Sequence, residues 1–189
     1  MSRATRWTSR DLEQLPADGH RYEIIDGELH VSTQPHFYHQ LTCVATIRVL
    51  DRWNADTAAG RVAIAPGVVF AEDDDVAPDL VWISKARLAA TLRSDGHLHA
   101  APELVVEVLS PGPVNERRDL VAKLALYARR GVDEYWVLNW RNRSVTVYRR
   151  DERTLGLVGT FDESDILQSP FLPGFRGEVG ALFADIPAD

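Results

Sequence analysis

The sequence predicts a mixed α/β fold in which helices cover the faces of a central sheet. Residues 104–109 form a nearly continuous apolar run rich in β-branched residues, which is typical of a strand buried on both faces. A helical pattern over 115–130 and a second apolar strand over 134–139 follow it. A strand, a helix and a strand in this order can form a βαβ crossover, which places the helix over the sheet.

The N-terminal segment predicts a short helix followed by a β-hairpin. Thr8 and Asp11 have the spacing of a capping box, and Pro16 ends the helix. Asp26 and Gly27 form a strong hairpin-turn signal between two short strands. The helix is expected over 8–15 and the strands over 22–25 and 28–32.

A long helix and several strands are predicted for the middle of the chain. After Pro35, no Gly or Pro interrupts residues 36–54, and apolar residues recur there at roughly helical spacing until Ala59-Gly60. The acidic run 72–75 is expected to be a turn. The other expected elements are a strand over 61–70 broken near Pro66-Gly67, a strand over 80–83, a helix over 85–92, a polar loop over 93–101 and a strand over 103–109.

The crossover helix is expected to begin at Asn115, which is a suitable N-cap, and to end at Gly131. The strands at 134–139 and 144–148 should then pair as a hairpin. The remaining expectations are a strand over 155–161, a turn-rich segment over 169–175 and a closing helix over 179–184. We expect one domain, 1–189, with a core over about 35–140, an N-terminal helix and hairpin over 8–32 and C-terminal strands and tail over 144–184.

Composition and charge narrow the function classes. The chain has 189 residues, 45% hydrophobic and 26% charged, as in ordinary globular proteins, and its net charge of −7 argues against coating nucleic acid through bulk electrostatics. Paired arginines such as Arg129-Arg130 are expected to be mostly solvated. No apolar run could span a bilayer, residues 1–6 lack a secretory signal, and the single Cys43 excludes an internal disulfide, so we expect a cytoplasmic location.

Glu107 is the first candidate functional residue, because it lies inside the apolar strand. A carboxylate there must be neutralised, paired or bound to a metal ion. Asp79 begins the preceding strand directly after Pro78, and Lys123 lies on the helix that follows. Two converging carboxylates are suitable ligands for Mg²⁺, and a lysine ammonium can polarise a nucleophile.

Each candidate also has a structural interpretation. Asp79 can be a turn residue after proline, and Glu107 can form an ion pair with an arginine such as Arg117. Asp119 and Lys123 lie four residues apart and can form an exposed pair worth about 0.3–0.5 kcal/mol.

Other polar and aromatic residues give weaker signals. His36 and His39 lie three residues apart, but a zinc site would need a further ligand, so surface or structural roles are favoured. We expect loop positions for His97 and His99, and a turn position for Ser110, which has no nearby base in the sequence. The aromatic residues Tyr135, Trp136 and Trp140 are expected to pack in the core and sheet.

Six blocks of sequence carry a family resemblance. They are YEIIDGEL, APDLVWIS, APELVVEVLSPG, DLVAKLALYARRGVDEYWVL, VTVYR and SPFLPGF. Together with the helix-strand-strand-strand-helix-strand order, they resemble the bacterial Uma-type restriction endonuclease family, long catalogued as a domain of unknown function, within the PD-(D/E)XK restriction-endonuclease-like superfamily. The similarity runs from about Tyr22 to Phe183.

The resemblance implies a metal-dependent endonuclease that hydrolyses phosphodiester bonds in DNA, with Asp79 and Glu107 holding Mg²⁺ or Mn²⁺. In the standard motif a lysine follows the second acid by two residues, whereas Leu109 stands there in this chain. The resemblance implies that Lys123 replaces it. Because the first helix of this fold borders the active site, His39 and, in the hairpin, Glu28 are further weak candidates.

Two further expectations remain open at the level of sequence. The missing motif lysine and the negative net charge also fit a catalytically silent binding or interaction module of the same fold. A homodimer is the default assembly, since many nucleases of this fold cut two strands as dimers.

Overall fold

The computed structural model describes residues 6–187 and builds the chain around a six-stranded sheet with the order β10-β9-β8-β7-β6-β3. β7 and β8 run parallel, and the other neighbouring pairs run antiparallel. The predicted mixed α/β class is therefore confirmed. The strands are β3 (Gly60–Ile64), β6 (Leu80–Ser84), β7 (Leu104–Val108), β8 (Glu134–Asn139), β9 (Ser144–Asp151) and β10 (Thr154–Phe161).

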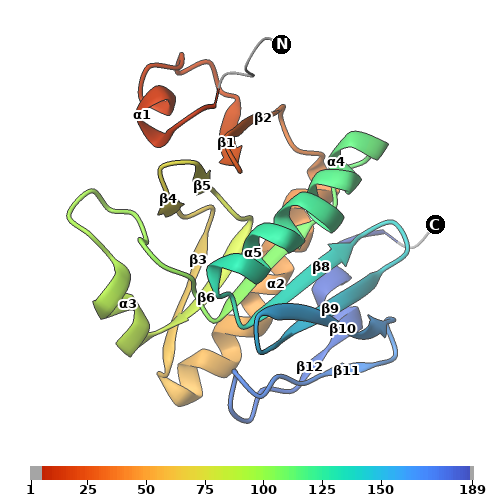
Figure 1. The fold of residues 1–189 in the computed structure, drawn as a ribbon. Helices are drawn as coiled ribbons and strands as arrows, with labels where there is room; N and C mark the ends of the chain where they lie inside the picture. The colour runs from red at the N-terminus through yellow and green to blue at the C-terminus, as the bar shows by residue number, and fades with distance from the viewer. Residues whose placement is uncertain (1–5, 188–189) are drawn as a thin grey trace.

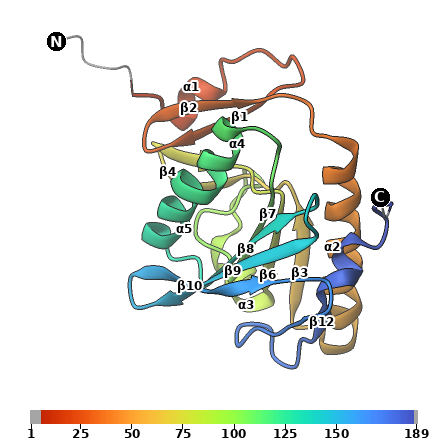
Figure 2. The ribbon, with the colours of Figure 1, turned by 90° about the vertical axis from the view of Figure 1, so that its right-hand side faces the viewer.

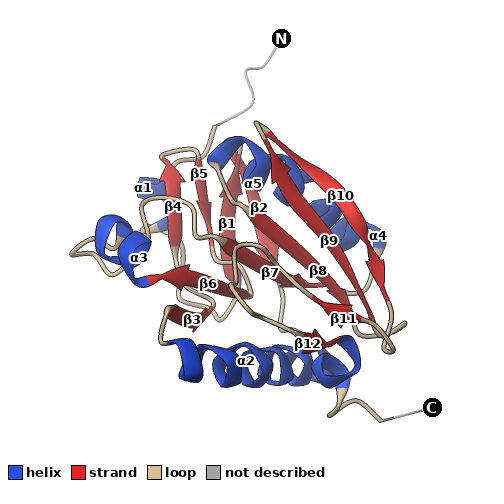
Figure 3. Ribbon diagram, turned by 90° about the horizontal axis from the view of Figure 1, so that it is seen from below, coloured by secondary structure: helices blue, strands red, loops and turns tan. Residues whose placement is uncertain are grey.

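Helices cover both faces of this sheet, as Figures 1 and 2 show for α2 (Phe37–Thr57) on one face and α5 (Leu124–Arg130) on the other. Seen from below, α2 runs across the sheet as a separate layer (Figure 3). Alternate residues of β7 face opposite ways, so Val106 packs in the core cluster that contains Cys43 of α2, whereas Val105 packs in the cluster that contains Leu126 of α5. Glu107 therefore faces the α5 side.

The connection between β7 and β8 is the predicted crossover helix, but it begins earlier and is not uniform. It consists of α4 (Pro113–Arg117), the π-helical turn η1 (Arg118–Lys123) and α5. The prediction that Asn115 is the N-cap was wrong, because Pro113 can occupy the first helical turn and Gly112 precedes it as the cap. The Asn115 side chain instead donates a hydrogen bond to the Pro111 carbonyl at 2.9 Å.

A second, four-stranded sheet with the order β2-β1-β5-β4 packs beside the crossover helix, where Figures 1 and 2 show β1 and β2 next to α4. The predicted hairpin is confirmed, with Ile24 opposite Leu29 and positive φ angles at Asp26 and Gly27 in the turn. The strands are β1 (Arg21–Ile25), β2 (Glu28–Ser32), β4 (Val68–Ala71) and β5 (Asp74–Val76).

The acidic run 72–75 is only partly a turn. Asp74 and Asp75 belong to β5. The Asp74 carboxylate is buried, and Arg129 and Arg130 neutralise it, each with a nitrogen 2.6 Å from a carboxylate oxygen. These two arginines are therefore bound rather than merely solvated. The chain over 61–70 likewise contains two strands, β3 and β4, which belong to different sheets.

The remaining elements follow the predicted order. Thr8 and Asp11 form the expected capping box at α1, and His36 caps α2 by accepting a hydrogen bond from the Tyr38 N–H. The closing helix is a 3₁₀ helix, and a short strand pair before it was not predicted. These elements are α1 (Ser9–Leu12), α3 (Lys85–Thr91), β11 (Ile166–Leu167), β12 (Gly177–Glu178) and η2 (Val179–Phe183).

Within residues 6–187, no helix has both the length and the apolar character that crossing a bilayer requires. Residues 1–5, which were considered above for a secretory signal, lie outside the described part of the chain.

Burial of Cys43 gives a direct test of this packing. The residue is 2% exposed, and burial raises the pKa of its thiol well above the ordinary value, so little reactive thiolate forms in the folded protein. We expect iodoacetamide at about pH 8 to label the native protein at least ~100-fold more slowly than the protein in concentrated guanidinium chloride. Mass spectrometry of the single thiol measures both rates, and equal rates would contradict this packing.

Candidate active site

The register of two strands brings the predicted carboxylates together. β6 and β7 pair antiparallel with Leu80 opposite Val106, so one further step along the same register sets Asp79 opposite Glu107. The backbone N–H of Val108 donates to Asp79 Oδ2 at 2.9 Å, which ties the start of β6 to the end of β7. Asp79 is thus held by the sheet itself rather than lying in a free turn.

Glu107 is 2% exposed and has two side-chain donors on one oxygen. Lys123 Nζ donates to Oε1 at 2.8 Å and the Tyr127 hydroxyl donates to the same atom at 2.7 Å. Among the described residues no hydrogen bond reaches Oε2. Burial raises the pKa of Glu107 to about 8, although the Lys123 ammonium opposes that rise.

Lys123, which the resemblance implied as the replacement of the motif lysine, reaches Glu107 from the crossover helix. Its ammonium lies 3.0 Å from Glu23 Oε1 as well as 2.8 Å from Glu107 Oε1, and its side chain is 1% exposed. These carboxylates raise the pKa of Lys123 above its ordinary value although burial alone would lower it. Leu109, which stands at the motif position of the lysine, packs instead among apolar residues of the α5 side.

Glu23 was missed by sequence reasoning. It lies in β1, is 1% exposed, and also accepts the backbone N–H of Ala77 at 3.0 Å. The available signal was an acid directly before Ile24 and Ile25 in a predicted strand, but only the position of Lys123 shows why an acid is tolerated there.

Asp119 does not form the exposed pair with Lys123 that the helical spacing allowed. Both side chains are buried, and Asp119 pairs with Arg118, whose Nε lies 3.0 Å from Oδ1. Burial raises the pKa of Asp119. Arg117, considered above as a partner of Glu107, is exposed, so the partner of Glu107 is Lys123.

The π-helical turn η1 determines which side chains of this helix face the sheet. In an α-helix, residues five apart point in directions that differ by roughly 140°. A π-helix closes its hydrogen bonds over five residues, so Arg118 and Lys123 come to one side. Both therefore line the same cavity as Glu107.

Asp79 is surrounded by donors. Arg21 Nη1 lies 2.9 Å from Oδ1, and His39 Nε2 lies 3.1 Å from Oδ2, the atom that also accepts the Val108 N–H. Burial alone would raise the pKa of Asp79, but His39, Lys123 and Arg21 together hold it well below the ordinary value. Asp79 is therefore ionised at neutral pH.

His39 has a different place from His36, with which the sequence grouped it. It is 5% exposed and contacts Asp79, so it is buried beside a predicted site residue and does not lie on the surface. His36 instead stacks on Trp140 with ring centroids 4.8 Å apart.

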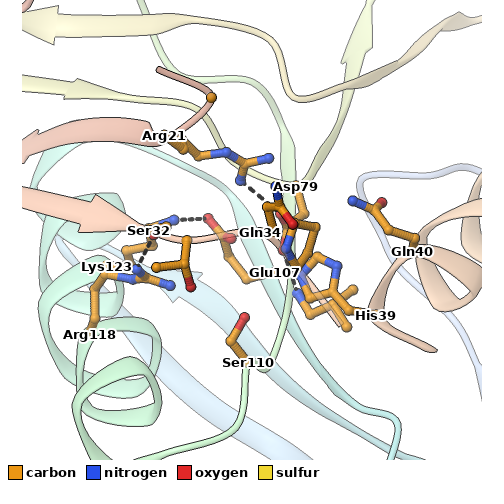
Figure 4. Close-up of a pocket in the computed structure, with 14 residues that line it drawn as sticks. Arg21, Ser32, Gln34, His39, Gln40, Asp79, Glu107, Ser110, Arg118 and Lys123 are labelled. Carbon is orange, nitrogen blue, oxygen red and sulfur yellow. Dashed lines mark hydrogen bonds and ion pairs between the residues drawn. The ribbon is translucent and has the colours of Figure 1, made fainter. Parts of the chain in front are cut away.

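One cavity of about 200 Å³, which we call the acid pocket, is lined by Arg21, His39, Asp79, Glu107, Arg118 and Lys123 (Figure 4). Loop residues close its rim between β2 and α2 and after β7. Its polar lining, besides the residues above, consists of Ser32, Thr33, Gln34, Gln40 and Ser110.

Glu28, the other weak candidate, is exposed and lies outside the acid pocket. Tyr135 and Trp136 are fully buried in the core, as predicted.

The charges around the acid pocket do not balance. Four buried carboxylates, those of Glu23, Asp79, Glu107 and Asp119, share three permanent cations, those of Arg21, Arg118 and Lys123. A proton on Glu107 or a bound cation would compensate for the excess negative charge.

The donor set suits a hard cation with few protein ligands. Among residues 6–187 there is no group of three or more His, Cys, Asp or Glu side chains placed to hold a metal ion. Two carboxylates, one of them Glu107 with no hydrogen bond on Oε2 from the described residues, match Mg²⁺, which usually keeps several waters and binds one or two protein carboxylates together with phosphate.

Comparison with known proteins supports the same architecture. The model of the family described as "Putative restriction endonuclease" (Uma2) matches residues 9–182. The structure of "a putative nuclease belonging to DUF820" from Anabaena variabilis ATCC 29413 superposes with a TM-score of 0.75 and 17% sequence identity, covering 94% of this chain and 97% of that chain. That likeness shows a shared restriction-endonuclease-like fold.

A weaker match is the type IIG restriction endonuclease BpuSI, with a TM-score of 0.40, 17% identity and coverage of 78% of this chain and 15% of that chain. No curated protein matches the sequence.

Removing Lys123 should destabilise the fold strongly. Lys123→Met leaves Glu23 and Glu107 buried without their shared cation, so we expect the free energy of unfolding to fall by about 3–5 kcal/mol in urea denaturation. The control Lys85→Met removes an exposed lysine and should change stability by less than about 0.5 kcal/mol. Similar stabilities for both variants would show that the buried ion pairs contribute little.

The raised pKa of Glu107 predicts a pH dependence of stability. Its stabilising contribution is complete below the ordinary value of 4.5 and is lost as the pH rises toward about 8, where the buried carboxyl must ionise. Without metal, the wild type should therefore lose more unfolding free energy between these pH values than Glu107→Gln, whose amide stays neutral. Parallel urea titrations measure the difference, and identical pH profiles would mean that Glu107 keeps an ordinary pKa.

Proposed function

The chain belongs to the Uma2 family of restriction-endonuclease-like proteins, and from this membership we propose that it is a metal-dependent endonuclease that hydrolyses phosphodiester bonds in DNA. One observation carries the proposal. Asp79, Glu107 and Lys123, which lie far apart in the chain, line a single cavity where β6 begins and β7 ends. Two carboxylates and a lysine form the residue set that this class of hydrolysis requires.

Asp79 and Glu107 would hold the cation, Mg²⁺ or Mn²⁺. Glu107 Oε2 is the atom best placed for it, because the hydrogen bonds of Glu107 among the described residues all go to Oε1. Asp79 remains ionised at neutral pH, so it needs no proton loss before it binds a cation. When bound, such a cation supplies an activated water and stabilises the charge that develops on the phosphate.

The other residues of the acid pocket would orient the Asp79 carboxylate and polarise the attacking water or the phosphate. Lys123 supplies a fixed positive charge beside Glu107 that can polarise the attacking water or steady a phosphate oxygen. Arg21 and His39 hold the Asp79 carboxylate from two directions. The Val108 N–H fixes the same carboxylate against β7, so neither acid depends on a flexible loop.

A second candidate function is a catalytically silent binding module. It is favoured because the candidate groups already bind one another. Both Asp79 oxygens accept hydrogen bonds, and two carboxylates bind Lys123. Because these groups are already paired with one another, their hydrogen bonds and ion pairs need no metal ion. Only the excess negative charge would still need a proton or a cation.

Cleavage of DNA is the first test. We expect pure protein to nick or cut supercoiled plasmid or single-stranded DNA with millimolar Mg²⁺ or Mn²⁺ and to be inactive in EDTA. Glu107→Gln and Asp79→Asn should each lower the rate at least ~100-fold, because each removes a metal ligand. The matched control Glu28→Gln changes an exposed glutamate outside the acid pocket and should cleave like the wild type.

Calorimetric titration with Mn²⁺ separates the two candidates. Binding that Glu107→Gln abolishes, together with cleavage, supports the nuclease. Equal cleavage by the wild type and Glu107→Gln would point to a contaminating enzyme, and the absence of both binding and cleavage would favour the silent module.

A further inference from the structure

We propose that Arg118 is a substrate-binding residue whose guanidinium holds a non-bridging oxygen of the phosphodiester in the acid pocket. This inference rests on the proposed function and adds the group that recognises the phosphate. The residues named so far bind a cation or orient one another, and none of them explains how an anionic backbone enters a pocket with excess negative charge.

The guanidinium of Arg118 is held in place from two sides. Its Nε donates to Asp119 Oδ1 at 3.0 Å, and its Nη1 donates to Ser32 Oγ at 2.5 Å, which connects the crossover helix to the end of β2 (Figure 4). Two anchors on two different nitrogens fix the plane of the group. A donor that is already oriented loses little freedom when it binds a ligand.

In the part of the chain that the structure describes, one donor atom of Arg118 has no hydrogen-bond partner and is not fully buried. Among the described residues its Nη2 has no hydrogen-bond partner. The buried polar atoms without partners in that part of the chain are Trp140 Nε1 and Arg143 Nε, so Arg118 Nη2 is not sealed inside the protein. The side chain as a whole is only 12% exposed, so its accessible part faces the cavities that it lines.

The position of Arg118 is where a backbone phosphate would pass. The residue lines the acid pocket and the adjoining groove next to Asn115, neither of which Arg117 lines. The π-helical turn brings it to the same side as Lys123. A strand that runs through these cavities can therefore contact Arg118 while one phosphodiester faces Glu107.

Arg21 is a weaker choice for this role. Both of its hydrogen bonds, to Asp79 and to the Ala77 carbonyl, come from the single atom Nη1, and its side chain is 35% exposed. Its orientation is therefore less fixed than that of Arg118. A guanidinium held like that of Arg118 keeps Nη2 aimed in one direction, which suits a charge-assisted hydrogen bond to one phosphate oxygen.

Equilibrium binding tests the inference separately from catalysis. The probe is a short fluorescein-labelled single-stranded DNA, bound in EDTA and followed by fluorescence anisotropy. Arg118→Gln should weaken binding ~10- to 100-fold, as expected for a lost charge-assisted hydrogen bond, and should reduce the salt slope by about 0.7. The matched control Arg117→Gln removes the same charge from the neighbouring exposed residue and should weaken binding less than about 3-fold.

Arg118→Lys protects the test against misfolding. It keeps a cation beside Asp119, so thermal unfolding should stay close to the wild type, but it lacks the planar fork and should still lose ~10-fold in affinity. If the protein cleaves DNA, these variants should also raise KM more than Arg117→Gln does. A purely structural role for Arg118 would change thermal stability and leave the affinity of the folded variants at the level of Arg117→Gln.

The outcomes distinguish this inference from the proposed function. Cleavage and binding by the wild type, with Arg118→Gln and Arg118→Lys binding as tightly as Arg117→Gln, would overturn the role of Arg118 and leave the nuclease standing. Selective loss of binding in the Arg118 variants without metal-dependent cleavage would support Arg118 and reject the nuclease. Absence of DNA binding by the wild type would overturn the inference.

Discussion

The burial of Glu107 is the constraint on which the site depends. A carboxylate in the middle of β7 loses its hydration, and the protein compensates with Lys123 and Tyr127 on one of its oxygens. Lys123 in turn is 1% exposed and also pairs with Glu23 from the second sheet. A single acid in the central sheet therefore links the crossover helix and the N-terminal hairpin into one electrostatic cluster.

The same cluster leaves the site prepared for ligands. The carboxylates around it exceed the permanent cations, and among the described residues neither Glu107 Oε2 nor Arg118 Nη2 has a hydrogen-bond partner. Such a site favours a proton, a metal ion or a phosphate with its cation, and it provides fixed groups to meet them. The same few contacts thus contribute to stability and to the proposed chemistry. A substitution at this site can therefore change both activity and the free energy of unfolding.

The displaced lysine shows how a residue set can be kept while its position in the chain changes. At Leu109, the usual motif position, the side chain packs in the apolar cluster on the α5 side of the sheet. Lys123 approaches Glu107 from the helix instead, and the π-helical turn rotates it and Arg118 to one side. The π-helical turn therefore places a lysine beside Glu107 although a leucine occupies the strand position.

The sequence by itself determined the mixed α/β class, most of the elements, and the candidates Asp79, Glu107 and Lys123, because apolar periodicity, turn residues and an acid in an apolar strand are local patterns. Only the tertiary structure decided that Arg118 and His39 share their cavity, that Glu23 pairs with Lys123, and that Asp119 is buried and pairs with Arg118. Those residues come from elements far apart in the chain, and the helical turn that aligns two of them departs from the 3.6-residue period. Strand register, helix packing and that local widening are set by the folded whole, so no local pattern could predict them.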